Sequence, residues 1–124
     1  MIQKESLLWV GDNSDALKAL CIHTNKKKNT HRKTSLANFV KATIKKRVSR
    51  RKNIKRRVNW FLVGSTAKRI ARKSGDGIRF ARTKVVLVDE KQKKTLGTRI
   101  KGVLPREVSA AGAQDIVLRA RRLV

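Results

Sequence analysis

Several residue types are scarce in this chain, and each scarcity excludes a class of protein. One cysteine among 124 residues cannot form an internal disulfide, which excludes a secreted scaffold held together by such bridges. One proline and seven glycines exclude collagen-like and low-complexity chains. The mean hydropathy is −0.49, and no apolar run approaches the ~20 residues of a membrane-spanning helix, so we expect no membrane partner.

Acidic residues are also scarce. Eight Asp and Glu oppose 33 Lys and Arg, which gives a net charge of +25 and an isoelectric point near 11.7. No acid lies between Ala16 and Gly75, although this stretch holds 20 Lys and Arg. Solubility of a small domain needs a net charge of magnitude only about 2–8, so the excess predicts a polyanionic partner. Nucleic acid fits best, because phosphate contacts release condensed counterions, whereas an anionic membrane usually needs an amphipathic helix.

The cations form two dense clusters in polar stretches between predicted strands, and we interpret these stretches as loops presented by a folded scaffold. The predicted RNA-binding residues are Lys26, Lys27, Lys28, Arg32, Lys33, Lys45, Arg47, Arg50, Arg51, Lys52, Lys55, Arg56, Arg57, Arg72 and Lys73. We expect the most ordered contacts from the two arginine pairs at 50–51 and 56–57, because a guanidinium can donate two parallel hydrogen bonds to phosphate. Any single lysine among them is equally well explained as a solvated surface charge.

The apolar residues predict a mainly β fold. Val40, Ala42 and Ile44 alternate with polar neighbours, which is the period of a strand with one buried face. Further strands are predicted at residues 7–10, 17–23, 78–80 and 85–88, with a short extended piece at 97–100, and residues 58–63 are apolar on both faces, as in a central strand. Five to seven short strands indicate a small barrel. From about residue 107 the pattern predicts short C-terminal helices separated or capped by Gly112, and we expect residues 1–124 to form one domain.

Catalytic and metal-binding constellations are weak. Cys21, His23 and His31 supply three potential ligands, but a structural zinc site needs four at tighter spacing, so we expect neither a metal nor another cofactor. Asp12 and Asp15 lie three residues apart without a histidine or lysine partner fixed by local sequence. We interpret them as turn-forming residues and expect no enzymatic activity.

The aromatic side chains are few and lie in strand patterns. We therefore expect them in the core and not as platforms on which RNA bases stack; they are Trp9, Trp60, Phe39, Phe61 and Phe80.

Six short segments occur in an order that resembles one family. They are Met1-Ile2-Gln3, Asp12-Asn13-Ser14, Cys21-Ile22, Ile78-Arg79-Phe80, Gly97-Thr98-Arg99-Ile100 and Arg106-Glu107. With these segments the chain closely resembles the bacterial-type large-subunit ribosomal protein L-fourteen over nearly its whole length. The resemblance implies a five-stranded β-barrel with a short helical tail, bound to large-subunit rRNA at the face that meets the small subunit.

The resemblance also implies protein partners and a compartment. It places an L-nineteen-like ribosomal protein beside the chain and implies bridges to small-subunit rRNA. Thr98 and Arg99 match positions at which the family contacts a ribosome-silencing factor. Where the family usually has Gly-Asp, this chain has Ala37-Asn38 in one loop and Arg56-Arg57 in another. These departures and the excess charge suit a mitochondrial ribosome; a bacterial cytoplasmic or plastid ribosome remains open.

Two other functions compete with a ribosomal one. A nucleoid or DNA-packaging protein would carry a comparable charge, but the sequence lacks the long basic arm or intercalating apolar wedge expected there. An RNA-processing enzyme would depend on Asp12, and turnover of RNA lost on Asp12→Ala would support it. The ribosomal reading predicts salt-sensitive binding to structured rRNA.

Overall fold

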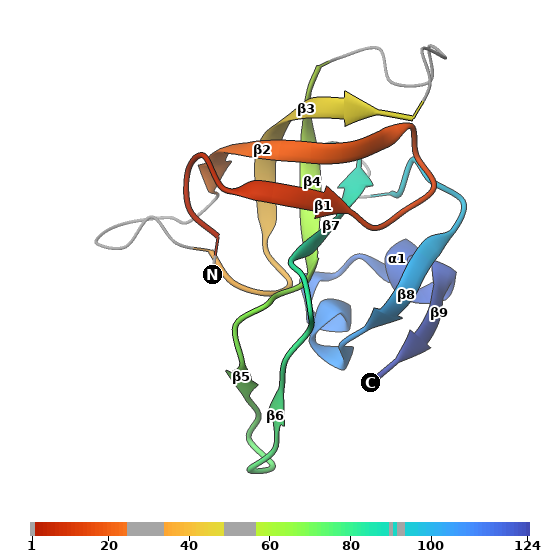
Figure 1. Ribbon diagram of the computed structural model, residues 1–124. Coiled ribbons are helices and arrows are strands. Elements are labelled where there is room, and N and C mark those ends of the chain that lie inside the picture. The colour runs from red at the N-terminus through yellow and green to blue at the C-terminus, as the bar shows by residue number, and fades with distance from the viewer. Residues whose placement is uncertain (1, 25–33, 49–56, 90, 92–93) are drawn as a thin grey trace.

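Five strands close into a barrel in the computed structural model, which describes residues 2–24, 34–48, 57–89, 91 and 94–124. The strands follow the order β1-β2-β3-β4-β7 around the barrel (Figure 1). Their bounds are Leu7–Val10 for β1, Ala16–Thr24 for β2, Phe39–Arg47 for β3, Val58–Ser65 for β4 and Lys84–Val88 for β7. Neighbours pair antiparallel except β1 and β7, whose parallel pairing closes the barrel. The predicted mainly β fold with a five-stranded barrel is confirmed.

Two small additions extend the barrel. Strands β5 (Ile70–Ala71) and β6 (Gly77–Ile78) form a hairpin that projects away from it (Figure 1). Strand β8 (Ile100–Leu104) pairs in parallel with β9 (Ala120–Leu123), and the 3₁₀-helix η1 (Arg106–Ala111) and helix α1 (Gln114–Arg119) connect the two. Gly112, with φ of +72°, caps η1 as the sequence predicts. No helix in the described part of the chain is long and apolar enough to cross a membrane.

One hydrophobic core fills the barrel. Val40, Ala42 and Ile44 point inward from β3 and are buried, which confirms the predicted alternation. Phe61 and Leu87 from the facing strands are fully buried in the same cluster.

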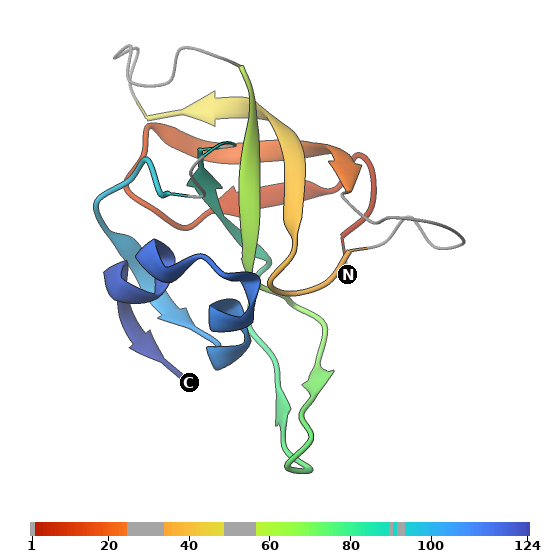
Figure 2. The same cartoon turned by 180° about the vertical axis from the view of Figure 1, so that it is seen from behind.

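A second core lies outside the barrel, against β4 and β7. Leu62 and Val86 point out of the barrel and pack with Val108 of η1 and Ile116 of α1, all of them buried. Figure 2 shows this C-terminal segment alongside the barrel. The second half of β4 and most of β7 are therefore buried on both faces, which explains why apolar residues occur on both faces of residues 58–63.

Two predicted elements differ from the structure, and one strand was not predicted. The strand expected at 78–80 ends at Ile78, because the Phe80 amide donates a hydrogen bond to the Thr66 carbonyl (3.2 Å) and leaves the hairpin ladder. The extended piece expected at 97–100 is a bend, and only Ile100 begins a strand. Strand β9 was not predicted, because its Ala-Arg-Arg-Leu sequence has no apolar alternation and its partner β8 is distant in sequence.

Candidate nucleic-acid and protein interface

A basic groove lies at one end of the barrel. Strand β3 contributes Lys45 and Arg47, and Arg57 lies just before β4. The Ile44 amide of β3 donates a 2.9 Å hydrogen bond to the Arg57 carbonyl and so holds Arg57 beside β3. These cations and Thr43 line an open space of about 570 Å³. The described lining residues include no acid, so three cationic side chains converge on a concave polar surface. Such a surface suits phosphate groups.

Ten of the predicted loop cations lie outside the described residues. They lie in sequence between β2 and β3 and between β3 and β4. Their role stays a prediction; they are Lys26, Lys27, Lys28, Arg32, Lys33, Arg50, Arg51, Lys52, Lys55 and Arg56.

The two predicted cations of the β5–β6 hairpin lie in different environments. Lys73 is exposed. Arg72 donates from Nε to Glu107 Oε1 (2.6 Å), and its Nη2 donates to Glu107 Oε2 (3.1 Å) and to the Val124 carbonyl (2.7 Å). The hydrogen bond from Arg72 lowers the pKa of Glu107. Arg72 thus ties the hairpin to the C-terminal segment, a contact that joins residues too far apart in sequence for local reasoning to find.

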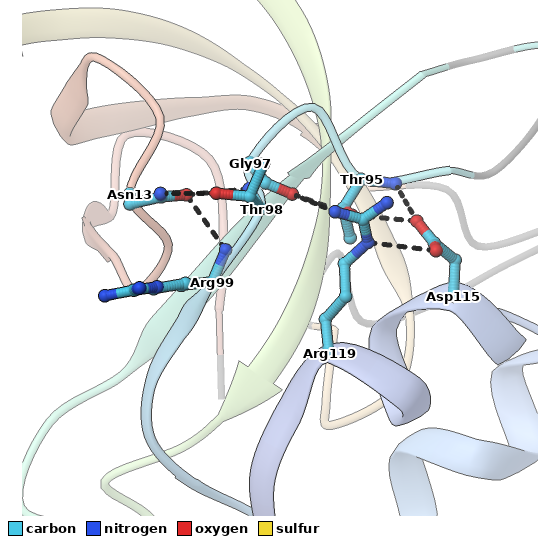
Figure 3. Close-up of polar contacts among 7 residues, drawn as sticks. All are labelled: Asn13, Thr95, Gly97, Thr98, Arg99, Asp115 and Arg119. Atoms are coloured by element: carbon cyan, nitrogen blue, oxygen red, sulfur yellow. Dashed lines mark hydrogen bonds and ion pairs between the residues drawn. The ribbon is translucent and has the colours of Figure 1, made fainter.

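Asn13 holds the loop that carries Thr98 and Arg99 (Figure 3). Its Oδ1 accepts hydrogen bonds from the amides of Thr98 (2.8 Å) and Arg99 (3.0 Å), and its Nδ2 donates to Thr98 Oγ1 (2.7 Å). A Cβ atom at Gly97 would lie 2.9 Å from Asn13 Oδ1, so only glycine allows this close approach. Thr98 and Arg99 are exposed, and the Arg99 guanidinium extends away from the hydrogen-bond network.

Helix α1 fixes the other side of the same loop (Figure 3). Asp115 Oδ2 accepts from the amide (3.0 Å) and the hydroxyl (2.8 Å) of Thr95. Arg119 donates from Nε to Asp115 Oδ1 (3.0 Å) and from Nη1 to the Gly97 carbonyl (3.2 Å). These bonds, led by the one from Arg119, lower the pKa of Asp115 to about 2. Sequence reasoning missed this network, although the four-residue spacing of Asp115 and Arg119 on a helix is a usable signal.

Asp12 forms the predicted turn and also contacts strand β7. Its Oδ1 accepts hydrogen bonds from the amide (3.2 Å) and the hydroxyl of Ser14, which confirms the turn. The side chain is also buried, and its Oδ2 accepts from the Leu87 amide (3.0 Å) in β7. Burial raises the pKa of Asp12 against the opposing effect of these hydrogen bonds. Its contacts therefore join a turn to a central strand.

The candidate metal ligands do not gather in the described part of the chain. Cys21 is buried, and burial raises the pKa of its thiol. His23 is exposed on the same strand, and His31 lies outside the described residues. Within the described ranges, no three His, Cys, Asp or Glu side chains lie close enough together to hold a metal ion.

The predicted core location is right for Phe61 and wrong for Trp9. Leu8 points into the barrel and is buried, so the next residue, Trp9, points outward and is 36 % exposed. Lys18 Nζ lies 4.4 Å and the Arg82 guanidinium carbon 4.7 Å from the centroid of the Trp9 ring. Two neighbouring leucines and a tryptophan left the inward face of this short strand ambiguous in the sequence.

The remaining aromatic residues are half-buried. Trp60 and Phe39 pack against the second core, and Phe80 lies at the base of the β5–β6 hairpin.

Comparison with known families agrees with the resemblance that the short motifs indicate. The family model described as ribosomal protein L14p/L23e matches residues 1–124, the whole chain. Membership implies a structural role in the large ribosomal subunit, and therefore in translation; proteins of this kind are not usually enzymes. The chain belongs to the ribosomal protein L14p/L23e family.

Proposed function

We propose that this protein binds large-subunit rRNA through the basic groove and its neighbouring loops. The observation that carries the proposal is the convergence of Lys45, Arg47 and Arg57 on one groove within a stretch of 20 cations and no acids. Closed strands hold this groove, so its cations are positioned before RNA arrives and less conformational entropy is lost on binding. Recognition then depends on rRNA shape and on phosphate and 2′-hydroxyl positions.

Salt dependence and charge reversal test this proposal. If about eight phosphates of a duplex region are neutralised, the logarithm of the affinity falls with the logarithm of the salt concentration at a slope of about −7. The variant Arg47→Glu/Arg57→Glu should bind an rRNA fragment more weakly and with a shallower slope. The matched control is Arg121→Glu/Arg122→Glu, two exposed cations of β9. Equal losses in both variants would show that net charge alone, and not the groove, determines binding.

The same measurements address DNA packaging. The ribosomal function predicts stronger binding to structured rRNA than to duplex DNA of equal length, and co-sedimentation with large subunits. Equal affinity for the two nucleic acids, with no protein in the large-subunit fraction, would contradict it.

We propose a second, proteinaceous contact for the loop of Thr98 and Arg99. Asn13 and Asp115 hold this loop from two sides, while both predicted contact residues remain exposed. The loop is therefore a rigid surface suited to a ribosome-silencing factor. Arg99→Glu should abolish capture by that factor, whereas Arg122→Glu should not. Retained capture by Arg99→Glu would exclude this loop.

We also propose a place on the intersubunit face, beside an L-nineteen-like protein and in bridges to small-subunit rRNA, within a mitochondrial ribosome. The support is family membership together with the departures at Ala37 and in the basic loops. Detection of the chain in the large-subunit peak of a gradient from isolated mitochondria tests the compartment. Its presence only in cytoplasmic or plastid ribosomes would refute it. Cross-linking of purified ribosomes tests the neighbours.

A further inference from the structure

A second cleft lies at the base of the β5–β6 hairpin, where the hairpin meets β7 and the C-terminal residues. It measures about 740 Å³, which lies within the usual range for ligand sites. Its lining includes Ser65, Arg79, Phe80, Arg82, Lys84 and Val124. Three of these described lining residues are cationic and none is acidic, and Phe80 supplies an aromatic ring. The cleft therefore combines an apolar surface with positive charge.

Hydrogen bonds fix the walls of this cleft. Ser65 is 2 % exposed; its hydroxyl donates to the Arg82 carbonyl (3.0 Å) and accepts from the Lys84 amide (3.2 Å). The Phe80 amide donates to the Thr66 carbonyl (3.2 Å). The cleft walls are thus attached to the end of β4, where the strand is buried on both faces. A ligand that enters would find its partners already positioned.

The exposed indole of Trp9 adjoins the cleft. Trp9 is paired with Lys84 in the barrel, and Arg82, which lines the cleft, has its guanidinium carbon 4.7 Å from the Trp9 ring centroid. Arg82 therefore lies over the Trp9 ring and lines the same cleft as Phe80. A flat aromatic ligand that carries negative charge matches this chemistry.

We propose that this cleft binds an unpaired nucleotide of single-stranded RNA. The base stacks on Phe80, or on Trp9 in place of the Lys18 ammonium that lies 4.4 Å from its ring centroid, and Arg79, Arg82 and Lys84 contact the flanking phosphates. An RNA ligand is favoured over an acidic peptide, because each nucleotide offers both a flat base that stacks on an aromatic ring and a phosphate that a neighbouring guanidinium binds. The inference deepens the proposed rRNA function by adding base stacking, whereas the basic groove supplies phosphate contacts alone.

Two oligonucleotides of equal charge separate stacking from electrostatics. The full-length protein is titrated by fluorescence anisotropy with labelled decaadenylate and with an abasic ribose-phosphate decamer. Stacking of one base predicts that decaadenylate binds about 5- to 150-fold more tightly. Equal affinities would overturn the inference, and this comparison needs no substitution in the protein.

Substitutions locate the stacking. Trp9→Ala and Phe80→Ala should each reduce the preference for decaadenylate, while Leu118→Ala, whose side chain is 81 % exposed on α1, should not. In a Trp60→Phe background, Trp9 is the sole tryptophan, and decaadenylate should quench its fluorescence. Thermal unfolding followed by circular dichroism checks that each variant is folded. A preference unchanged in folded Trp9→Ala and Phe80→Ala would place stacking elsewhere and overturn the inference.

The outcomes distinguish this inference from the proposed function. If an rRNA fragment binds with a steep salt slope but both decamers bind equally, the cleft proposal fails and the rRNA function stands. If neither the fragment nor the decamers bind, the rRNA function itself fails. If an acidic peptide containing phenylalanine quenches Trp9 while decaadenylate does not, the cleft binds protein and the inference is overturned.

Discussion

Asn13 is expected to order the loop that presents Thr98 and Arg99. Three side-chain hydrogen bonds join Asn13 to this loop, two accepted from backbone amides and one donated to Thr98 Oγ1. In Asn13→Ala all three are lost, while the bond from the Asn13 amide to the Arg99 carbonyl (3.1 Å) remains. A typical net value is about 0.5–1.5 kcal/mol per bond, and water can replace the lost partners at this exposed site. We therefore expect a loss of about 1–2 kcal/mol in the free energy of unfolding.

Amide hydrogen exchange measures the local effect directly. In the parent protein the Thr98 and Arg99 amides are hydrogen-bonded and should exchange slowly. In Asn13→Ala they should exchange faster, while amides of β4 remain protected to the extent set by global stability. Urea denaturation gives the change in the free energy of unfolding.

A conservative variant serves as the control. Asn13→Asp keeps an oxygen that can accept from both amides, and the Thr98 hydroxyl can reorient to donate to the carboxylate. Exchange at Thr98 and Arg99 should then stay close to that of the parent. Unchanged exchange in Asn13→Ala would show that the helix α1 side holds the loop alone, and would refute this reasoning.

Three further perturbations test other parts of the structure. Because the pKa of Asp115 falls from 3.8 to about 2 on folding, its contribution to stability is present above pH 3.8 and is lost as the pH falls towards 2. The free energy of unfolding of Asp115→Asn should not show this decrease at low pH. Ala37 has a φ of +61°, a left-handed conformation that strains alanine and not glycine. Ala37→Gly should therefore raise the free energy of unfolding by about 0.5–1 kcal/mol in urea denaturation, and a decrease would show that Ala37 is not strained. Ile116→Ala should lower the free energy of unfolding by about 2–5 kcal/mol. Because Ile116 belongs to the second core and the barrel core is unaltered, β8 and β9 amides should lose protection first.

The sequence predicts most of the barrel, because each strand is marked by a local pattern of apolar residues. Val40, Ala42 and Ile44 are buried where the alternation predicts, and the two apolar faces of β4 reflect the two cores on either side. The excess of positive charge predicts a polyanionic partner. Each of these signals resides within a few neighbouring residues.

Features that depend on distant pairing were not predictable. The exposure of Trp9 is set by the register of β1 against β2 and β7, which decides whether Leu8 or its neighbours point inward. Arg72 looks like any other loop cation until folding brings Glu107 and Val124 to it. The departure at Ala37 lies between these cases: the expected glycine signals a left-handed residue, and the structure shows that alanine adopts the same conformation there.

Strand β4 links the two surfaces for which we propose RNA contacts. Arg57 lies just before its first residue and lines the basic groove, while Ser65, its last residue, positions the walls of the cleft. Eight strand residues span about 26 Å at about 3.3 Å each. Burial of its second half on both faces keeps this distance fixed, so the two surfaces cannot approach each other to meet a short ligand. A single RNA that contacts both must therefore extend along the outside of the barrel, with backbone phosphates in the groove and an unpaired base at the cleft.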